Sequence, residues 1–252
     1  MKCLLLLIGA FSHVANAAPI VVPTTTTTFT GSNITEADDW NNGLPTGTEV
    51  GLINIDTNIP SGLADLTFVQ TAGNLTTGFN RTLGGMTWYL TGGSIASTAN
   101  LQHVSGNPFE IYVLGGSISA NQIRNRDGSL LYIESGSVTI SGSTLNMNGG
   151  FTTFGLGNGT LTADGLSSDG DSRINFLAGS GGALTIAGFA SSNYETLWNQ
   201  GRLQFDGGNT GTFSDHFQVS DSTLTVIPEP STLVLLGITG LAWVVNQRRR
   251  RK

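Results

Sequence analysis

A short signature recurs six times in the middle of the chain at a nearly constant period. Each copy has a small residue, a glycine, a variable residue, an aliphatic residue and a second variable residue. The six glycines are Gly73, Gly93, Gly116, Gly136, Gly159 and Gly182, which lie 20 to 23 residues apart. A period of this length indicates that the chain repeats one structural unit, and that each unit buries its apolar side chains by stacking on its neighbours.

Each period also contains at least two segments with strand character. Apolar and polar residues alternate over residues 137–140, and this period of two is typical of strands. A second recurrence lies upstream of each glycine, where an aromatic residue precedes it by four to six positions. These aromatic residues are Phe68, Tyr89, Tyr112, Tyr132, Phe154 and Phe176. A glycine turn therefore joins two short strands in every period.

The period and the strands together predict an all-β fold, a parallel β-helix (solenoid) of about six coils with a period of 20–23 residues. Equivalent residues of successive coils should then form columns, spaced about 4.8 Å apart. We expect glycines at the corners, where φ is positive, and serines and threonines outside. One interior column should contain Leu75, Ile95, Ile118, Val138, Leu161 and Leu184. An antiparallel meander or β-sandwich is the alternative, but it does not explain the constant period.

The segments before the repeat suggest a linker and a cap. Residues 18–37 are rich in threonine and are interpreted as a linker. Residues 38–71 are expected to form an N-terminal cap and the first strands, with Trp40 packed in the cap. Stacking of Trp40 on a sugar ring is the alternative. The β-helix repeats then span residues 72–205.

The pattern loosens after the last repeat glycine. Residues 191–201 could form the only short helix of the body, with Ser or Asn as its N-cap and Gly201 as its stop. Residues 202–206 and 223–227 have the character of closing strands, and we assign residues 206–226 to the closing region. This final irregular coil resembles the C-terminal cap of autotransporter-like and other exported β-solenoids.

The N-terminus has the three parts of a secretory signal peptide. Lys2 is followed by a short apolar run, and Ala15 and Ala17 have the spacing that a signal peptidase accepts. We expect a signal helix over residues 1–17, with cleavage after Ala17. Because Cys3 is the single cysteine of the chain, the mature protein would have no disulfide and no thiol nucleophile. A buried core helix is the alternative.

The C-terminus combines a Pro-x-Pro segment, an apolar run and a basic block. Pro228, Glu229 and Pro230 are followed by apolar residues 233–245 and by the basic tail 248–252. The run is short for a membrane-spanning helix, but it is long enough when its flanks are included. The basic tail should stay on the cytoplasmic side. A plain tail-anchored protein is one reading of this segment.

This order of parts closely resembles the PEP-CTERM sorting signal of bacterial exported proteins, over residues 227–252. The resemblance implies recognition by an exosortase, processing near Pro228-Glu229-Pro230, and release to the cell surface or the extracellular matrix. The transmembrane helix would be a transient inner-membrane anchor and the only membrane contact, much as in other removable hydrophobic tails. The sorting arginines are Arg248, Arg249, Arg250 and Arg251.

The charge of the body narrows the choice of partners. Without the two end segments, the chain has 5 basic and 16 acidic residues, a net charge of −11. Such a surface repels phosphate backbones and anionic headgroups, so we expect no nucleic-acid partner. Neutral glycans and divalent cations remain candidates.

The chain has few residues arranged for chemistry. His103 and His216 are isolated, and no nucleotide-binding, serine-hydrolase or zinc-protease motif is present. Asp164, Asp169 and Asp171 form the densest acidic cluster and are a weak candidate for Ca²⁺, although a solvated loop is favoured. We therefore expect no cofactor, no catalytic residue and no enzymatic activity.

The leading hypothesis is an exported structural or adhesive protein of the cell surface or extracellular matrix. Its expected partners are signal peptidase, exosortase and, as a further candidate, extracellular polysaccharide. The alternative is a secreted polysaccharide-binding or polysaccharide-degrading β-helix protein. An enzyme should have a cleft with converging carboxylates, which a structural rod does not need.

Overall fold

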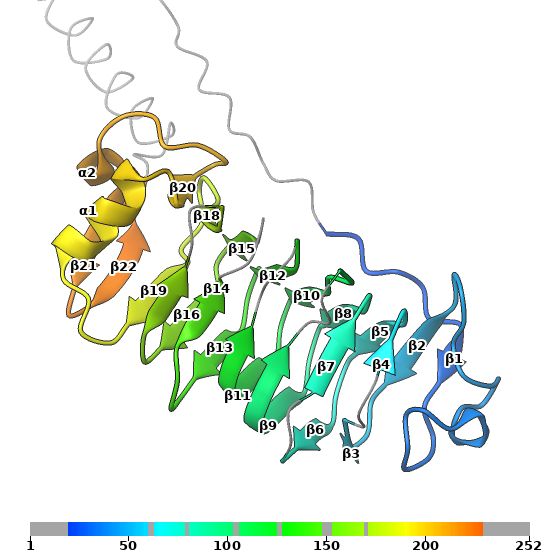
Figure 1. Cartoon of the computed structure of the whole chain (residues 1–252). Coiled ribbons are helices and arrows are strands. Elements are labelled where there is room, and N and C mark those ends of the chain that lie inside the picture. The colour runs from blue at the N-terminus through cyan, green and yellow to red at the C-terminus, as the bar shows by residue number, and fades with distance from the viewer. Residues whose placement is uncertain are drawn as a thin grey trace, which may run out of the picture.

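The chain winds into a parallel β-solenoid of about six turns, as Figure 1 shows for the computed structural model. The structure describes residues 20–59, 63–78, 81–102, 106–124, 128–147, 153–168 and 171–228. The predicted all-β fold and its parallel pairing are confirmed, and the antiparallel alternative is wrong for the repeats. The predicted signal helix and the predicted helix over residues 233–245 lie outside the described residues.

Two long sheets form two sides of the solenoid. Their strands pair in parallel from coil to coil, except at the C-terminal end of the second sheet, where the last two strands pair antiparallel. The first sheet has nine strands in the order β1 (Thr27–Thr28), β2 (Val50–Ile53), β5 (Thr67–Gln70), β8 (Thr87–Leu90), β10 (Glu110–Val113), β12 (Leu130–Ile133), β15 (Thr153–Leu156), β18 (Arg173–Phe176) and β20 (Leu203–Phe205). The second sheet follows the order β3 (Thr57–Asn58), β6 (Asn74–Thr77), β9 (Ser94–Gln102), β11 (Ser117–Arg124), β13 (Ser137–Ile140), β16 (Thr160–Ala163), β19 (Ala183–Ile186), β22 (Thr223–Val226) and β21 (Phe217–Ser220).

Four shorter strands lie off these two paths and pair with each other or with the long strands of the second sheet. They are β4 (Leu63–Ala64), β7 (Arg81–Gly84), β14 (Leu145–Met147) and β17 (Leu166–Ser168). β9 pairs with β6 near its start and with β7 near its end. Each coil in the middle of the solenoid therefore has a third side, which continues from the second.

The predicted interior column is confirmed residue by residue. Leu75 pairs with Ile95, which pairs with Ile118, and the register continues through the later coils. All six aliphatic side chains are at most 2% exposed. Their column is Leu75, Ile95, Ile118, Val138, Leu161 and Leu184, and Leu224 extends it from an antiparallel strand. The column forms because strict alternation places every second residue of each strand inside.

The corner glycines have the expected positive φ only in the first four copies of the repeat. Gly73 has φ 77° and Gly136 has φ 89°, in the region that favours glycine. Gly159 and Gly182 do not have positive φ, so that expectation is wrong for them. They are glycines because of close packing, since a Cβ on Gly159 would lie 2.2 Å from Cγ2 of Ile133.

The recurring aromatic residues divide into an inward and an outward set. Phe68 and Phe154 lie five residues before their glycines, and both point into the core. Tyr89, Tyr112 and Tyr132 lie four residues before theirs, which places them on the outside of the first sheet. A shift of one residue along a strand moves the side chain to the opposite face of the sheet. Phe176 is inward again because the corner before Gly182 is longer.

Trp40 is a core residue of the N-terminal end. It follows the short 3-10 helix Ala37–Asp39, and its side chain is only 3% exposed. Its ring stacks on Phe68 with a centroid distance of 5.7 Å, and its indole N–H donates to the Ile34 carbonyl at 2.9 Å. A buried ring of this kind has no face for a sugar. Thr27 and Thr28, which the sequence places in a linker, instead form β1 of the first sheet.

The C-terminal end is closed by α1 (Ser191–Asn199), α2 (Phe213–His216) and the antiparallel strands β21 and β22. α1 lies where a helix was expected, and it ends before Gly201, which has φ 68°. Its N-cap is Ala190, so the expected Ser or Asn N-cap is wrong. Asn193 instead stabilises this end from the third helical position, because its Oδ1 accepts the Ala190 N–H at 2.8 Å.

Candidate functional site

The predicted sorting segment begins where the folded body ends. β22 ends at Val226, and the Ile227 N–H donates to the His216 carbonyl at 2.8 Å. Pro228 follows and is exposed. The other predicted sorting residues, Glu229, Pro230 and Arg248 to Arg251, lie outside the described residues, as do Ala15 and Ala17. The last strand of the cap therefore leads directly into the Pro-x-Pro segment.

His216 has a packing role at this exit. Its imidazole stacks on Phe205 with a centroid distance of 4.6 Å, and its Nε2 lies 2.8 Å from the Thr210 carbonyl oxygen. The neighbouring Asp215 accepts the Thr212 N–H at 2.7 Å, and this hydrogen bond lowers the pKa of the exposed carboxyl. Asp215 therefore stabilises the start of α2, and His216 packs the end of α2 against Phe205. His103 lies outside the described residues.

The acidic cluster considered for calcium is described only in part. Asp164 accepts the Gly142 N–H with its Oδ2 at 2.5 Å, a contact that joins two coils. Asp169 lies outside the described residues, so the calcium prediction remains a prediction. Among the residues that the structure describes, no group of three or more His, Cys, Asp or Glu side chains could hold a metal ion.

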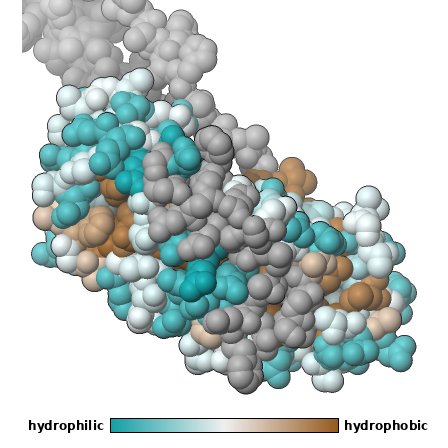
Figure 2. Space-filling model, viewed as in Figure 1, coloured by the Kyte–Doolittle hydropathy of each residue, from teal (hydrophilic) through white to brown (hydrophobic). Residues whose placement is uncertain are grey.

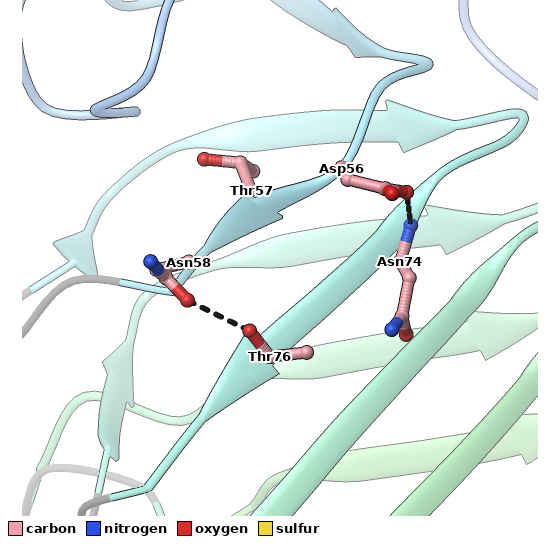
Figure 3. Close-up of a pocket in the computed structure, with 5 residues that line it drawn as sticks. All are labelled: Asp56, Thr57, Asn58, Asn74 and Thr76. Atoms are coloured by element: carbon pink, nitrogen blue, oxygen red, sulfur yellow. Dashed lines mark hydrogen bonds between the residues drawn. The ribbon is translucent and has the colours of Figure 1, made fainter.

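An open pocket of about 350 Å³ lies on the second sheet near the N-terminal end (Figure 3). Asp56 accepts the backbone N–H of Asn74 at 2.7 Å, and Asn58 accepts the hydroxyl of Thr76 at 2.7 Å. Two pairs of lining residues thus bond to each other across adjacent coils, while the hydroxyl of Thr57, the fifth lining residue, donates to the Ser32 carbonyl at 3.1 Å. With one carboxylate, the pocket lacks the acid and base pair that glycoside hydrolysis requires.

A second pocket lies in the C-terminal cap, between α1 and the segment before α2. Its single carboxylate is Glu195, which accepts the hydroxyl of Ser191 at 3.0 Å. Trp198 and Phe213 supply the apolar part of the lining. This pocket also lacks a second carboxylate.

The outer face of the second sheet carries small hydroxyls in register. They come from β11, β13 and β16 and form two neighbouring columns of three, namely Ser117, Ser137 and Thr160, and Ser119, Thr139 and Thr162. None of these six side chains is charged. On the side of the molecule seen in Figure 2, white and teal residues predominate outside the grey atoms, with separate brown patches.

The outer face of the first sheet carries the three aligned tyrosines. The rings of Tyr89 and Tyr112 stack with centroids 4.9 Å apart and planes 9° apart. The Tyr112 hydroxyl donates to Glu110 at 3.0 Å, and the Tyr132 hydroxyl donates to Glu134. Burial, together with the neighbouring carboxylate, raises the pKa of both phenols. We call these five residues the tyrosine strip.

In the sequence, the three tyrosines stand out only together with the three phenylalanines that also precede the repeat glycines. The signal that separates them is their position four residues before the corner glycine. The two carboxylates lie two residues before Tyr112 and two residues after Tyr132, which are outward positions on the same face. Their pairing with the phenols follows from that alternation, although no motif marks it.

Alkaline pH should unfold the body through its tyrosines. All four tyrosines have a raised pKa, and burial raises that of Tyr194 from 10 to about 12. The folded state therefore favours the neutral phenol of Tyr194, so its stabilisation is complete below pH 10 and disappears as the pH rises through about 12. The raised pKa of the other three tyrosines acts in the same direction. A titration should show tyrosinate absorbance and loss of β-sheet circular dichroism together. Full ionisation near pH 10 with an unchanged β spectrum would contradict this.

Comparison with known proteins identifies the C-terminal segment. Residues 226–251 match the PEP-CTERM protein-sorting motif. The resemblance seen in the Pro-x-Pro segment, apolar run and basic tail is thus confirmed. The chain is an exosortase-sorted exported protein with a C-terminal anchor stage, and its described body is a β-solenoid. None of the curated proteins and none of the solved structures matches the chain.

Within the part of the chain that the structure describes, the helices are too short or too polar to cross a membrane. The predicted membrane segment, residues 233–245, is outside that part.

Proposed function

We propose that the protein is a non-enzymatic structural or adhesive component of the cell surface or extracellular matrix. The main support for this proposal is that the capped β-solenoid leads directly into the PEP-CTERM protein-sorting motif. Signal peptidase would cut after Ala17, and exosortase would process the chain near Pro228. The product would be a short rod with an acidic surface.

The chemistry of the described residues supports a role without catalysis. The two pockets have one carboxylate each, and those carboxylates already accept hydrogen bonds from neighbouring groups. His216 is held between an aromatic ring and a backbone carbonyl. Hydrolysis of a glycan by two carboxylates requires a free acid and a free base on either side of the bond. Asp56 contacts the next coil, Glu195 bonds within its own helix and His216 packs in the C-terminal cap, and these contacts account for the three groups without a reaction.

The localisation can be tested with the full chain in a bacterium that has an exosortase. Tagged protein should be found in the cell-surface and matrix fractions in a shortened form. Recovery of the shortened protein solely from the periplasm or the cleared medium would refute a surface or matrix role.

The lack of activity can be tested on the same recovered protein. We expect no product from uronate-containing, neutral or sulfated polysaccharides with added Ca²⁺. Reproducible product formation that is lost when Asp164, Asp169 or Asp171 is replaced by Ala would instead support the polysaccharide-degrading alternative.

A further inference from the structure

The tyrosine strip differs from the rest of the outer surface because its aromatic rings are partly exposed in register. Tyr89, Tyr112 and Tyr132 each lie between two buried residues of their strand, so their side chains leave the core. Their coils are adjacent, and the register aligns the three residues directly. Three such rings form a continuous apolar band along the solenoid axis.

The last ring of the band has a different orientation from the first two. The Tyr112 and Tyr132 planes are 59° apart, with centroids 6.3 Å apart. The residue that follows Tyr132 in the column is Gly155. A Cβ on Gly155 would lie 2.4 Å from Cδ2 of Tyr132, so the ring occupies the space that a side chain would fill. Tyr132 therefore leans over the glycine backbone, and its side chain remains partly exposed.

Carboxylates lie at both edges of the band. Glu110 accepts the Tyr112 hydroxyl, and Glu134 accepts the Tyr132 hydroxyl. Glu110 precedes its tyrosine by two residues, whereas Glu134 follows its tyrosine by two, so the two acceptors flank the rings on opposite sides. Beyond Gly155, the column continues with Asn175, whose Oδ1 accepts the Gly207 N–H at 2.8 Å.

We propose that the tyrosine strip binds a neutral polysaccharide chain, with a sugar ring stacked on Tyr132. This proposal rests on the proposed surface or matrix role, and it names the surface through which the protein would bind the matrix. The C–H face of a pyranose is apolar and fits an exposed aromatic face, while its hydroxyls can donate to carboxylates at the edge. An anionic polymer is disfavoured because Glu110 and Glu134 repel it and the body has a net charge of −11.

The direction of the strip also fits a polymer. Stacked coils repeat about every 4.8 Å, so the three tyrosines offer contacts to successive parts of an extended chain. Aromatic side chains dominate many binding interfaces because they bury a large area with little loss of side-chain freedom. Tyr132 should therefore contribute most, and Tyr112 and Tyr89 should extend the contact.

The test uses the full chain in a bacterium that has an exosortase, followed by affinity electrophoresis of the recovered processed protein. The gels contain dextran, laminarin, hydroxyethyl cellulose or galactomannan, with alginate as the acidic comparison. At least one neutral polymer should retard the wild type, and alginate should not. Tyr132→Ala should weaken that retardation about tenfold, while Tyr132→Phe should retain most of it.

Two further variants separate binding from folding. Gly155→Thr keeps a strand-compatible residue but displaces the Tyr132 ring, so it should also weaken binding while circular dichroism remains that of the wild type. The matched control is Thr139→Ala on the second sheet, which should bind as the wild type does. No retardation by any neutral polymer, or equal retardation of the wild type and Tyr132→Ala, would overturn the proposal.

The same cells distinguish this proposal from the proposed function. If Tyr132→Ala is processed normally but shifts from the matrix fraction to the medium, both are supported. If the wild type is at the surface and Tyr132→Ala stays there, the surface role holds and the tyrosine strip is not the contact. If the wild type never reaches the surface or matrix, the proposed function itself fails.

Discussion

Replacing Pro228, Glu229 and Pro230 together with alanine should abolish processing and leave full-length protein in the inner membrane. Ile227 is held by its hydrogen bond to His216, so the Pro-x-Pro segment begins at a fixed point on the cap. Proline restricts the backbone of the residue before it to extended conformations, and the alanine variant would remove that restriction. Immunoblots of membrane, surface and medium fractions would show the uncut chain.

The matched control for this variant replaces three exposed hydroxyl residues of the second sheet, Thr139, Thr160 and Thr162, with alanine. These residues are far from the exit in the sequence, and the control should be processed as the wild type is. A shortened, surface-located form of the Pro228-Glu229-Pro230 variant would show that these residues are not needed. Uncut protein outside the membrane would contradict the anchor stage.

Much of the fold could be predicted because the repeat carries two independent signals. The spacing of the glycines gives the coil length, and the aliphatic residue two positions after each glycine gives the inward phase. Leu75 and Leu184 are more than a hundred residues apart in the chain, yet both lie in the predicted column. In a repeat fold each coil contacts only its neighbours, so the pattern within one period predicts which residues of distant coils share a column.

The ends were less predictable because they lack a period. Composition places Thr27 and Thr28 in a linker, but their backbone pairs with β2 and Thr27 is buried. Threonine is common both in linkers and in strands, so composition could not decide between them. The Ala190 N-cap was missed for a related reason, because Asn193 stabilises the helix start from inside the helix.

The two candidate functional segments, the sorting segment and the tyrosine strip, also differ in how easily they can be found from sequence. The sorting segment could be found from sequence because its parts are contiguous in the chain. The tyrosine strip has a weaker signal, the position four residues before the corner glycine, which Gly155 shares with the tyrosines. That position predicts which residues align, but only the structure shows that the Tyr132 ring occupies the space beside Gly155.

Replacing Leu224 with aspartate should detach the C-terminal cap and make the protein aggregate. Leu224 is fully buried and pairs with Leu184, so it ends the interior column. An unpaired carboxylate at this position should cost about 4 kcal/mol or more, a large part of the stability of a typical domain. Loss of β22 would expose the edge of β19, and exposed edges pair with other chains. Light scattering and size-exclusion chromatography of the recovered protein should show much larger particles than those of the wild type.

The matched control is Thr225→Asp, which places the same charge one residue further along β22. Thr225 is partly exposed and lies opposite Ala183 and Gln218, so its side chain is on the outer face. This variant should lose less than about 1 kcal/mol of stability and elute as the wild type does, because an exposed charge stays hydrated. The two variants share the strand and the added charge, so a difference between them isolates the buried column. If Leu224→Asp elutes as the wild type does and has an unchanged urea midpoint, β22 does not close the solenoid. If both variants aggregate, the added charge rather than the buried position is responsible.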